Sequence, residues 1–199
     1  MRRAFDIAGA LVLLLLTLPL LIVASAVVLI TSGRPVFFGH MRVGRGGRLF
    51  RCWKLRTMAI DAERVLDRVP DLRARYVANG YKLPMTQDPR VTLPGRWLRR
   101  SYIDELPQFF NVLNGTMSLV GPRPVVPDEL TNYGTAAAEL LTARPGIFGA
   151  WALGGRTRAP YPERVNVELE YVRSRTLAAD VVILVRSIPV VLSGQAPDA

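Results

Sequence analysis

An uncharged run near the start of the chain limits what this sequence can fold into. Residues Leu11 to Ile30 form 20 consecutive residues without a charge. As a helix, such a run covers about 30 Å, the thickness of the hydrocarbon core of a bilayer. A secretory signal peptide would fit the basic start and the cleavage-like triplet Ala24-Ser25-Ala26. The run continues past this triplet to Ile30, which favours a helix that stays in the membrane.

Pro19 lies near the centre of this run and argues against a straight spanning helix. A proline inside a helix removes one N–H donor and clashes with the carbonyl four residues earlier, so we expect a break at Pro19. Basic residues flank both ends of the run, and lysine and arginine at membrane ends stay in the cytoplasm. The pattern predicts a re-entrant helix over residues 1–32 that returns to its side of entry, followed by a cytoplasmic domain over residues 33–199. The basic residues after the run, with no acid before Asp61, are Arg34, Arg42, Arg45, Arg48, Arg51, Lys54 and Arg56.

The basic residues of the chain are almost all arginine. Of 26 basic residues only Lys54 and Lys82 are lysines, and the net charge is +10. Arginine forms bidentate contacts with phosphate and also suits an anionic membrane surface. Nucleic acid is a third class of partner, which charge alone does not exclude.

The composition excludes several kinds of site. Cys52 is the only cysteine, so the chain has no internal disulfide. His40 is the only histidine, which excludes a His-rich zinc site and a Ser-His-Asp triad. Any metal would therefore be an oxygen-ligated ion such as Mg²⁺.

The stretch from Arg99 to Pro127 is the most informative for chemistry. It places Asp104 and Glu105 ahead of Pro107 and the apolar run FFNVL, a pattern typical of a helix start. An Asp104 carboxylate at a helix N-terminus is expected to stay ionised.

Two interpretations of these acids compete. In the structural one, Ser101 and Asp104 form a capping box and the acids complement the helix dipole. In the chemical one, the carboxylates act on phosphate, since arginines surround them and the stretch closes with Pro122-Arg123-Pro124.

The whole string supports the chemical interpretation. Residues Ser101 to Pro124 read S-x-x-DELPQ-x-x-NVL-x-G-x-MSLVGPRP, which resembles the signature of the bacterial sugar transferases. These are monotopic polyprenyl-phosphate phosphoglycosyl transferases that initiate glycan assembly on membranes. Lys54-Leu55-Arg56-Thr57-Met58 resembles the family's K-F-R-[ST]-M, and Gln87 to Thr92 resembles its x-D-P-R-[IV]-T. The resemblance covers nearly the whole chain.

Some positions depart from the family pattern. They bear on the hydrogen bonding of the helix break, on the turn before Asp104 and on sugar identity. The departures are Leu18 and Tyr102 in place of serine, His40 and Ala152 in place of glutamine, Phe148 in place of threonine, and Gly154 in place of asparagine.

The resemblance implies an α+β, mainly helical fold. It consists of a re-entrant N-terminal membrane helix, small strands and amphipathic interfacial helices around one compact catalytic domain, at the cytoplasmic face of the bacterial inner membrane. The residues themselves predict strands within 33–58, with Trp97 and Leu98 packed beneath the site. They also predict helices over 61–79 with an interruption at Pro70, over 128–143 and over 162–175, and an interfacial segment over 178–193.

The resemblance also implies a reaction. A sugar-1-phosphate would pass from a nucleotide diphosphate sugar, with UDP the expected nucleotide, to polyprenyl phosphate, through a covalent intermediate on Asp104. A nucleoside monophosphate would be released in this first step of glycan, exopolysaccharide, capsule or glycoprotein assembly. Glu105 would hold Mg²⁺, with Mn²⁺ as the alternative, and Arg99, Arg123 and Lys54 would bind the phosphates. Nucleic acid is not among these partners, and a homodimer stays open.

The main alternative is not an enzyme. A membrane-tethered basic module could bind nucleic acid or anionic lipid through charge alone. It assigns no role to Asp104 or Glu105 and predicts an affinity that falls steeply with salt. A polytopic transferase would need more than one hydrophobic segment.

Overall fold

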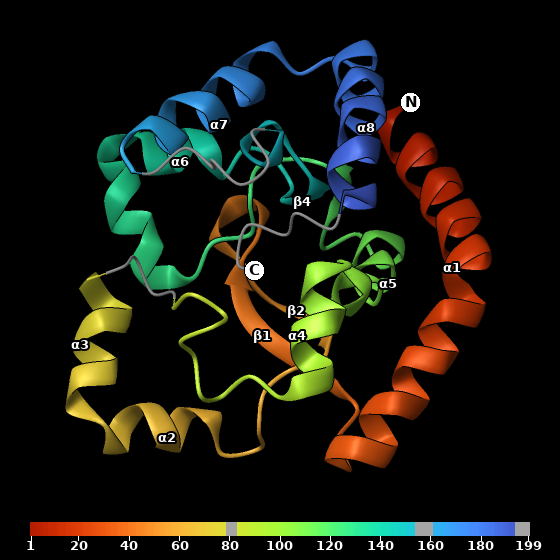
Figure 1. Cartoon of the computed structure of the whole chain (residues 1–199). Coiled ribbons are helices and arrows are strands. Elements are labelled where there is room, and N and C mark those ends of the chain that lie inside the picture. The colour runs from red at the N-terminus through yellow and green to blue at the C-terminus, as the bar shows by residue number, and fades with distance from the viewer. Residues whose placement is uncertain (79–82, 154–160, 194–199) are drawn as a thin grey trace.

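The computed structural model describes residues 1–78, 83–153 and 161–193. This part of the chain is mainly helical, with two small two-stranded sheets near its centre (Figure 1). The mainly helical fold predicted from the sequence is confirmed.

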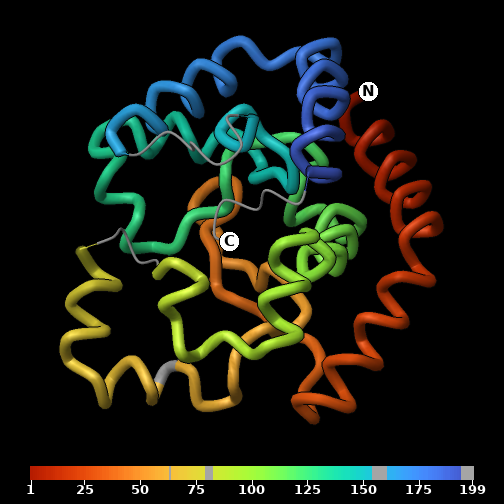
Figure 2. Tube along the Cα trace, in the orientation of Figure 1, coloured from red at the N-terminus to blue at the C-terminus, as the bar shows by residue number. Residues whose placement is uncertain are grey.

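Helix α1 (Arg2–Ser32) runs along one side of the molecule and bends along its length (Figures 1 and 2). It continues through Pro19, so the expected break is not an interruption of the helix. The Thr17 hydroxyl donates to the Leu13 carbonyl at 2.7 Å, a contact that often bends helices. A re-entrant path through a bilayer stays a prediction.

One face of α1 packs on the rest of the chain. Ala10 belongs to one buried cluster, and Leu21, Ala24 and Val28 belong to a second, which also holds Leu55 and Leu98. Most other side chains of the helix are exposed, including Leu15, Leu16, Ile22, Val23 and Ile30. Among the described residues, α1 is the one helix long and apolar enough to cross a membrane. The division at residue 32 stays a prediction.

The predicted strands within 33–58 form an antiparallel hairpin, β1 (Phe37–Val43) and β2 (Leu49–Leu55), joined by a 3₁₀ turn, η1 (Arg45–Gly47). Phe38 lies opposite Lys54, and His40 lies opposite Cys52. Side chains two residues apart on a strand point to the same face, so Lys54 and Cys52 lie on one face of the hairpin.

Two short helices follow, α2 (Ala62–Arg68) and α3 (Pro70–Ala78), with the interruption at Pro70 as predicted. The next helix is α4 (Leu93–Arg100), which Thr92 caps by accepting a hydrogen bond from the Gly95 N–H at 3.1 Å. Leu98 is fully buried, as expected, whereas the prediction for Trp97 is wrong: it is 55% exposed. Adjacent residues on a helix point about 100° apart, and in α4 Leu98 points into the core whereas Trp97 lies outside the buried face.

The acids do not begin an α-helix. They lie in a 3₁₀ turn, η2 (Ile103–Glu105), and helix α5 (Gln108–Leu113) begins only after Pro107. The capping-box interpretation is also wrong, because Ser101 ends α4. Its hydroxyl donates to the carbonyls of Trp97 at 2.9 Å and Leu98 at 3.1 Å.

The C-terminal half wraps a short parallel sheet, β3 (Ser118–Val120) and β4 (Gly146–Phe148). The helix predicted over 128–143 is mostly a 3₁₀ segment, η3 (Pro127–Ala136), before the short α6 (Ala137–Leu140). Gly134, at φ 50° and ψ −130°, interrupts regular helical geometry there. After a 3₁₀ turn, η4 (Ala150–Ala152), α7 (Glu163–Ser174) confirms the helix predicted over 162–175.

The last helix, α8 (Leu177–Leu192), lies beside the start of α1 (Figure 1). Asp180, Ile183 and Ser187 are buried, whereas six large apolar side chains along the helix are exposed: Leu177, Val181, Val182, Val185, Ile188 and Leu192. An exposed apolar face suits the interfacial role, which stays a prediction.

Candidate active site

The two adjacent acids of η2 lie against the end of β2. The Lys54 ammonium is 2.6 Å from the Glu105 carboxylate. Burial acts to lower the pKa of Lys54, but the carboxylates of Glu105 and Asp104 raise it above its ordinary value. Lys54 is therefore a fixed positive charge beside both acids.

Asp104 is only 5% exposed. Burial raises the pKa of its carboxyl group from 3.8 to about 7; Lys54 and Arg99 act to lower it, and Glu105 acts to raise it further. The expectation that Asp104 stays fully ionised is therefore wrong for the free protein. The 3₁₀ turn gives it no helix terminus to stabilise the charge, and burial outweighs the two cations.

A strained turn presents this acid. Tyr102 adopts the left-handed conformation at φ 59°. Such a conformation in a bulky residue costs on the order of 1–3 kcal/mol and persists where the surroundings enforce it. The Tyr102 N–H donates to the Arg99 carbonyl at 3.2 Å, and the Glu105 N–H donates to the Tyr102 carbonyl at 3.1 Å. The turn links the end of α4 directly to the acids.

Arg99 is held by the segment that follows β2. Its Nε donates to the Thr57 hydroxyl at 2.8 Å. Gly95 lets α4 come this close, because a Cβ at that position would lie 2.1 Å from the Thr57 carbonyl oxygen. Arg56, next to Thr57, donates to the carbonyls of Ser32 and Gly33, which holds the end of α1 against the same segment.

The Pro-Arg-Pro loop lies near the hairpin. The Arg123 N–H donates to Glu168 at 3.3 Å, and its guanidinium lies 5.4 Å from the ring centre of Trp151. Arg42 donates to the Pro124 carbonyl at 3.0 Å. Side chains from other elements therefore hold the loop at Arg123 and at Pro124.

Cys52 is a buried thiol near both the acids and the Pro-Arg-Pro loop. Burial raises the pKa of its thiol, and the charges of Lys54, Glu105, Arg42 and Arg123 all act on that pKa. Glu105 and Arg123 of the Pro-Arg-Pro loop are thus both close enough to Cys52 to affect the pKa of its thiol.

Comparison with known proteins shows the family of the chain. The family model described as bacterial sugar transferase matches residues 1–194. The chain belongs to the bacterial sugar transferase family. The transferase is 42% identical over 194 residues to the exopolysaccharide production protein ExoY of Rhizobium meliloti, covering 96% of this chain and 84% of that protein.

Two longer relatives align with the transferase over the same region. It is 42% identical to the undecaprenyl-phosphate galactose phosphotransferase of Salmonella typhimurium, over 96% of this chain and 40% of that protein. It is 40% identical to the undecaprenyl-phosphate glucose phosphotransferase of Komagataeibacter xylinus, over 94% of this chain and 35% of that protein. The chain thus spans well under half the length of these two proteins.

The structure of the transferase brings Lys54, Arg99, Asp104 and Glu105 together and places Arg123 on the neighbouring loop. Pro19 lies within α1 and takes no part in this cluster. Of the positions that depart from the family pattern, Phe148 lies in β4 and Ala152 in η4 beside Trp151, whereas Gly154 lies outside the described residues.

Sequence reasoning missed the buried acid beneath the Pro-Arg-Pro loop. Glu168 is 1% exposed, and burial raises its pKa to about 7. It accepts a hydrogen bond from the Tyr133 hydroxyl at 2.6 Å. Nothing in the local sequence distinguishes Glu168 from the neighbouring Glu163 and Glu170, because its partners lie 35 and 45 residues away.

A magnesium ion at Glu105 stays a prediction. Within the described ranges, no group of three His, Cys, Asp or Glu side chains could hold an ion. Mg²⁺ in phosphate enzymes is bound through one or two carboxylates together with substrate phosphates and water. Glu105, with Asp104 beside it, suits an ion that arrives with a diphosphate.

Proposed function

We propose that the chain is a phosphoglycosyl transferase that moves a sugar-1-phosphate from a UDP-sugar to polyprenyl phosphate. The observation that carries the proposal is the buried Asp104 carboxyl between Lys54, Arg99 and Glu105. The names of its relatives supply the reaction class: undecaprenyl-phosphate galactose and glucose phosphotransferases, and a protein of exopolysaccharide production.

In the first step, a carboxylate oxygen of Asp104 attacks the phosphorus that bears the sugar. The bond from that phosphorus to the bridging oxygen breaks, and UMP leaves with this oxygen and its electron pair. Asp104 then carries the sugar-phosphate as an acyl phosphate. A pKa of about 7 leaves close to half of the carboxyl groups ionised at neutral pH in the free protein. A carboxylate of raised pKa is also a stronger nucleophile than an ordinary one.

In the second step, an anionic oxygen of polyprenyl phosphate attacks the same phosphorus. The bond between Asp104 and phosphorus breaks, and the electron pair restores the carboxylate. The product is a polyprenyl diphosphate sugar. Each step exchanges one phosphorus–oxygen bond for another, so no oxidant or reductant is needed.

The surrounding side chains stabilise charge in both steps. Lys54 and Arg99 lie beside the nucleophile, where they compensate the oxygens of the transferring phosphate. Arg123, held between two prolines, presents a guanidinium suited to bidentate phosphate binding. Glu105 would hold Mg²⁺, which when bound neutralises diphosphate charge and stabilises the leaving oxygen.

The reaction requires a site at the membrane surface, because one substrate is soluble and the other is a lipid. The exposed apolar faces of α1 and α8 suit insertion into one leaflet of the inner membrane from the cytoplasmic side. An enzyme anchored in this way reaches both substrates without spanning the bilayer.

A panel of nucleotide sugars tests the proposal, with UDP-galactose and UDP-glucose first. UMP release is measured with and without polyprenyl phosphate. We expect a burst close to one UMP per chain without the lipid, and continuous release with it. UMP release that continues at the same rate without the lipid would indicate a hydrolase. No release with any donor, together with salt-dependent DNA binding, would favour the charged-module alternative.

A further inference from the structure

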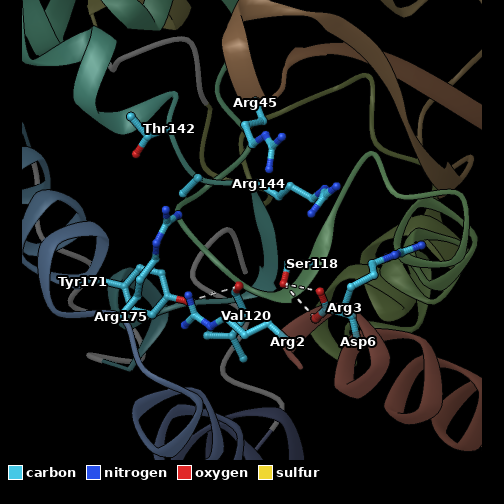
Figure 3. A pocket seen from close by; sticks show the side chains of 11 residues that line it. Arg2, Arg3, Asp6, Arg45, Ser118, Val120, Thr142, Arg144, Tyr171 and Arg175 are labelled. Atoms are coloured by element: carbon cyan, nitrogen blue, oxygen red, sulfur yellow. Dashed lines mark hydrogen bonds between the residues drawn. The ribbon is translucent and has the colours of Figure 1, made fainter.

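A second basic site lies away from the acids. A cavity of about 180 Å³ opens between the start of α1, β3 and the junction of α7 and α8. Five arginines line it, with Asp6 as the one carboxylate among its described lining residues. Figure 3 shows Arg45 and Arg144 on one side of the cavity, with Arg2 and Arg175 across from them.

The acids near this cavity already have partners. Asp6 accepts hydrogen bonds from the Ser118 hydroxyl at 2.8 Å and the Leu119 N–H at 2.9 Å. Asp180 forms an ion pair with Arg2 at 2.7 Å and accepts a hydrogen bond from the Tyr171 hydroxyl at 2.7 Å. The five guanidinium groups of the cavity thus have only two described carboxylates near them, and both carboxylates already have partners.

Three of the arginines also have structural contacts. Arg3 donates to the carbonyls of Val112 at 2.6 Å and Leu113 at 2.9 Å, and Arg144 donates through Nε to the Gly115 carbonyl at 2.9 Å. These hydrogen bonds orient the side chains, but carbonyls do not neutralise their charge. The third is Arg2, through its ion pair with Asp180.

The other two arginines are available to a ligand. Within the described part of the chain, the side chains of Arg45 and Arg175 form no hydrogen bond or ion pair. Arg45 is also brought to the cavity by a fixed loop, since the next residue, Gly46, donates its N–H to the Leu141 carbonyl at 2.8 Å. Guanidinium groups gathered around one cavity repel one another unless an anion lies between them.

The position of the cavity indicates what the anion would be attached to. Arg2 and Arg3 begin α1 immediately before its apolar run, and Arg175 lies two residues before the apolar helix α8. If both helices lie in the membrane, these arginines lie at the depth of lipid phosphates. None of the cavity's described lining residues belongs to the cluster around Asp104.

We propose that this cavity is a second phosphate-binding site, which takes a phosphate-bearing anion separately from the Asp104 site. The shared chemistry is a phosphate held by Arg45, Arg175 and the terminal nitrogens of Arg144. The phosphate belongs either to the headgroup of an anionic phospholipid or to a soluble phosphate.

The full chain tests the proposal in two arms. In detergent, calorimetry measures the binding of inorganic diphosphate. In nanodiscs of equimolar phosphatidylglycerol and phosphatidylcholine, native mass spectrometry counts the phosphatidylglycerol that stays bound. The variant is Arg45→Gln with Arg175→Gln. The matched control is Arg48→Gln with Arg68→Gln, which removes the same charge from two exposed arginines outside the cavity.

We expect a loss of roughly tenfold for the cavity variant in at least one arm, since charge-assisted hydrogen bonds to phosphate are lost. The loss is measured as weaker affinity for diphosphate in calorimetry, or as less bound phosphatidylglycerol in mass spectrometry. The control should match the wild type. Loss in the nanodisc arm identifies a lipid headgroup, and loss in the calorimetric arm identifies a soluble phosphate. Thr142→Glu, which places a carboxylate at the cavity, should give the same loss. Unchanged binding of both probes, or an equal loss in the control, would overturn the proposal.

Discussion

At the scale of single residues, Asp104 combines burial with close cations. A nucleophilic carboxylate must be ionised to attack, yet burial holds its pKa near 7. Lys54 and Arg99 limit this rise, and a bound diphosphate with its metal would change the balance again.

The pKa of Asp104 gives a signed prediction of pH dependence. Its value is 3.8 unfolded and about 7 folded, so the folded state binds the proton more tightly. The resulting stabilisation is present below about pH 4 and is lost as the pH rises to about 7. Asp104→Asn lacks this titration. The melting temperature of the variant minus that of the wild type should therefore increase as the pH rises from 4 to 7. Wild-type kcat/KM should rise with pH up to about 7 and then level off. A constant difference in melting temperature across this range would contradict the assigned pKa.

A second residue-scale prediction concerns Arg123. Arg123→Lys keeps the charge but loses the fork that binds phosphate at two points. We expect kcat/KM for UMP release to fall by roughly 10- to 100-fold, as for loss of one charge-assisted hydrogen bond. Arg100→Lys, an exposed arginine of α4, is the matched control and should stay within about twofold. Equal effects of the two substitutions would show that only overall charge matters.

A third prediction concerns Glu105 and the metal. Removal of divalent ions should abolish UMP release, and either Mg²⁺ or Mn²⁺ should restore it, whereas zinc should not be required. Glu105→Gln should raise the Mg²⁺ concentration needed for half-maximal activity. Full activity after exhaustive chelation would rule out Glu105 as a metal ligand.

At the scale of elements, the sequence predicted strands within 33–58, the interruption at Pro70 and the helix over 162–175, because their signals are local. The start of α5 and the 3₁₀ segment η3 were not predictable in this way. The acids sit in η2 because Tyr102 adopts a left-handed turn, a conformation that no pattern indicates for tyrosine. At the candidate site, motif resemblance found Lys54, Arg99, Asp104, Glu105 and Arg123, but not Glu168, whose partners are distant in sequence.

The path of α1 in the membrane is an element-scale prediction. Single cysteines at Ala4 and Arg48 should both be labelled only from the cytoplasmic side, in a chain whose one natural cysteine is buried. Pro19→Leu should straighten the helix and favour a spanning path, so that one of the two sites becomes accessible from the opposite side. Periplasmic labelling of either site in the unsubstituted helix would contradict the re-entrant path. Unchanged labelling in Pro19→Leu would show that contacts of α1 with the domain, rather than proline, set its path.

At the scale of the whole molecule, the chain packs the buried Asp104 site and the apolar helix α1 into one structure. Arg56 holds the end of α1 to β2, and Arg3 holds its start to the end of α5. The anchor and the Asp104 site are therefore parts of one packed structure. A basic module that bound only by charge would have no use for a buried Asp104 beside Lys54 and Arg99.

The covalent intermediate tests this account most directly. Wild-type protein is incubated with its UDP-sugar without polyprenyl phosphate, digested and analysed by mass spectrometry. The peptide that contains Asp104 should gain the mass of one sugar-phosphate and lose it when polyprenyl phosphate is added. Asp104→Asn should show no added mass, and its turnover should fall by about a thousandfold or more, since no neighbour can replace the attacking carboxylate. Added mass on any other residue, or an active Asp104→Asn, would contradict the assignment of Asp104 as the nucleophile.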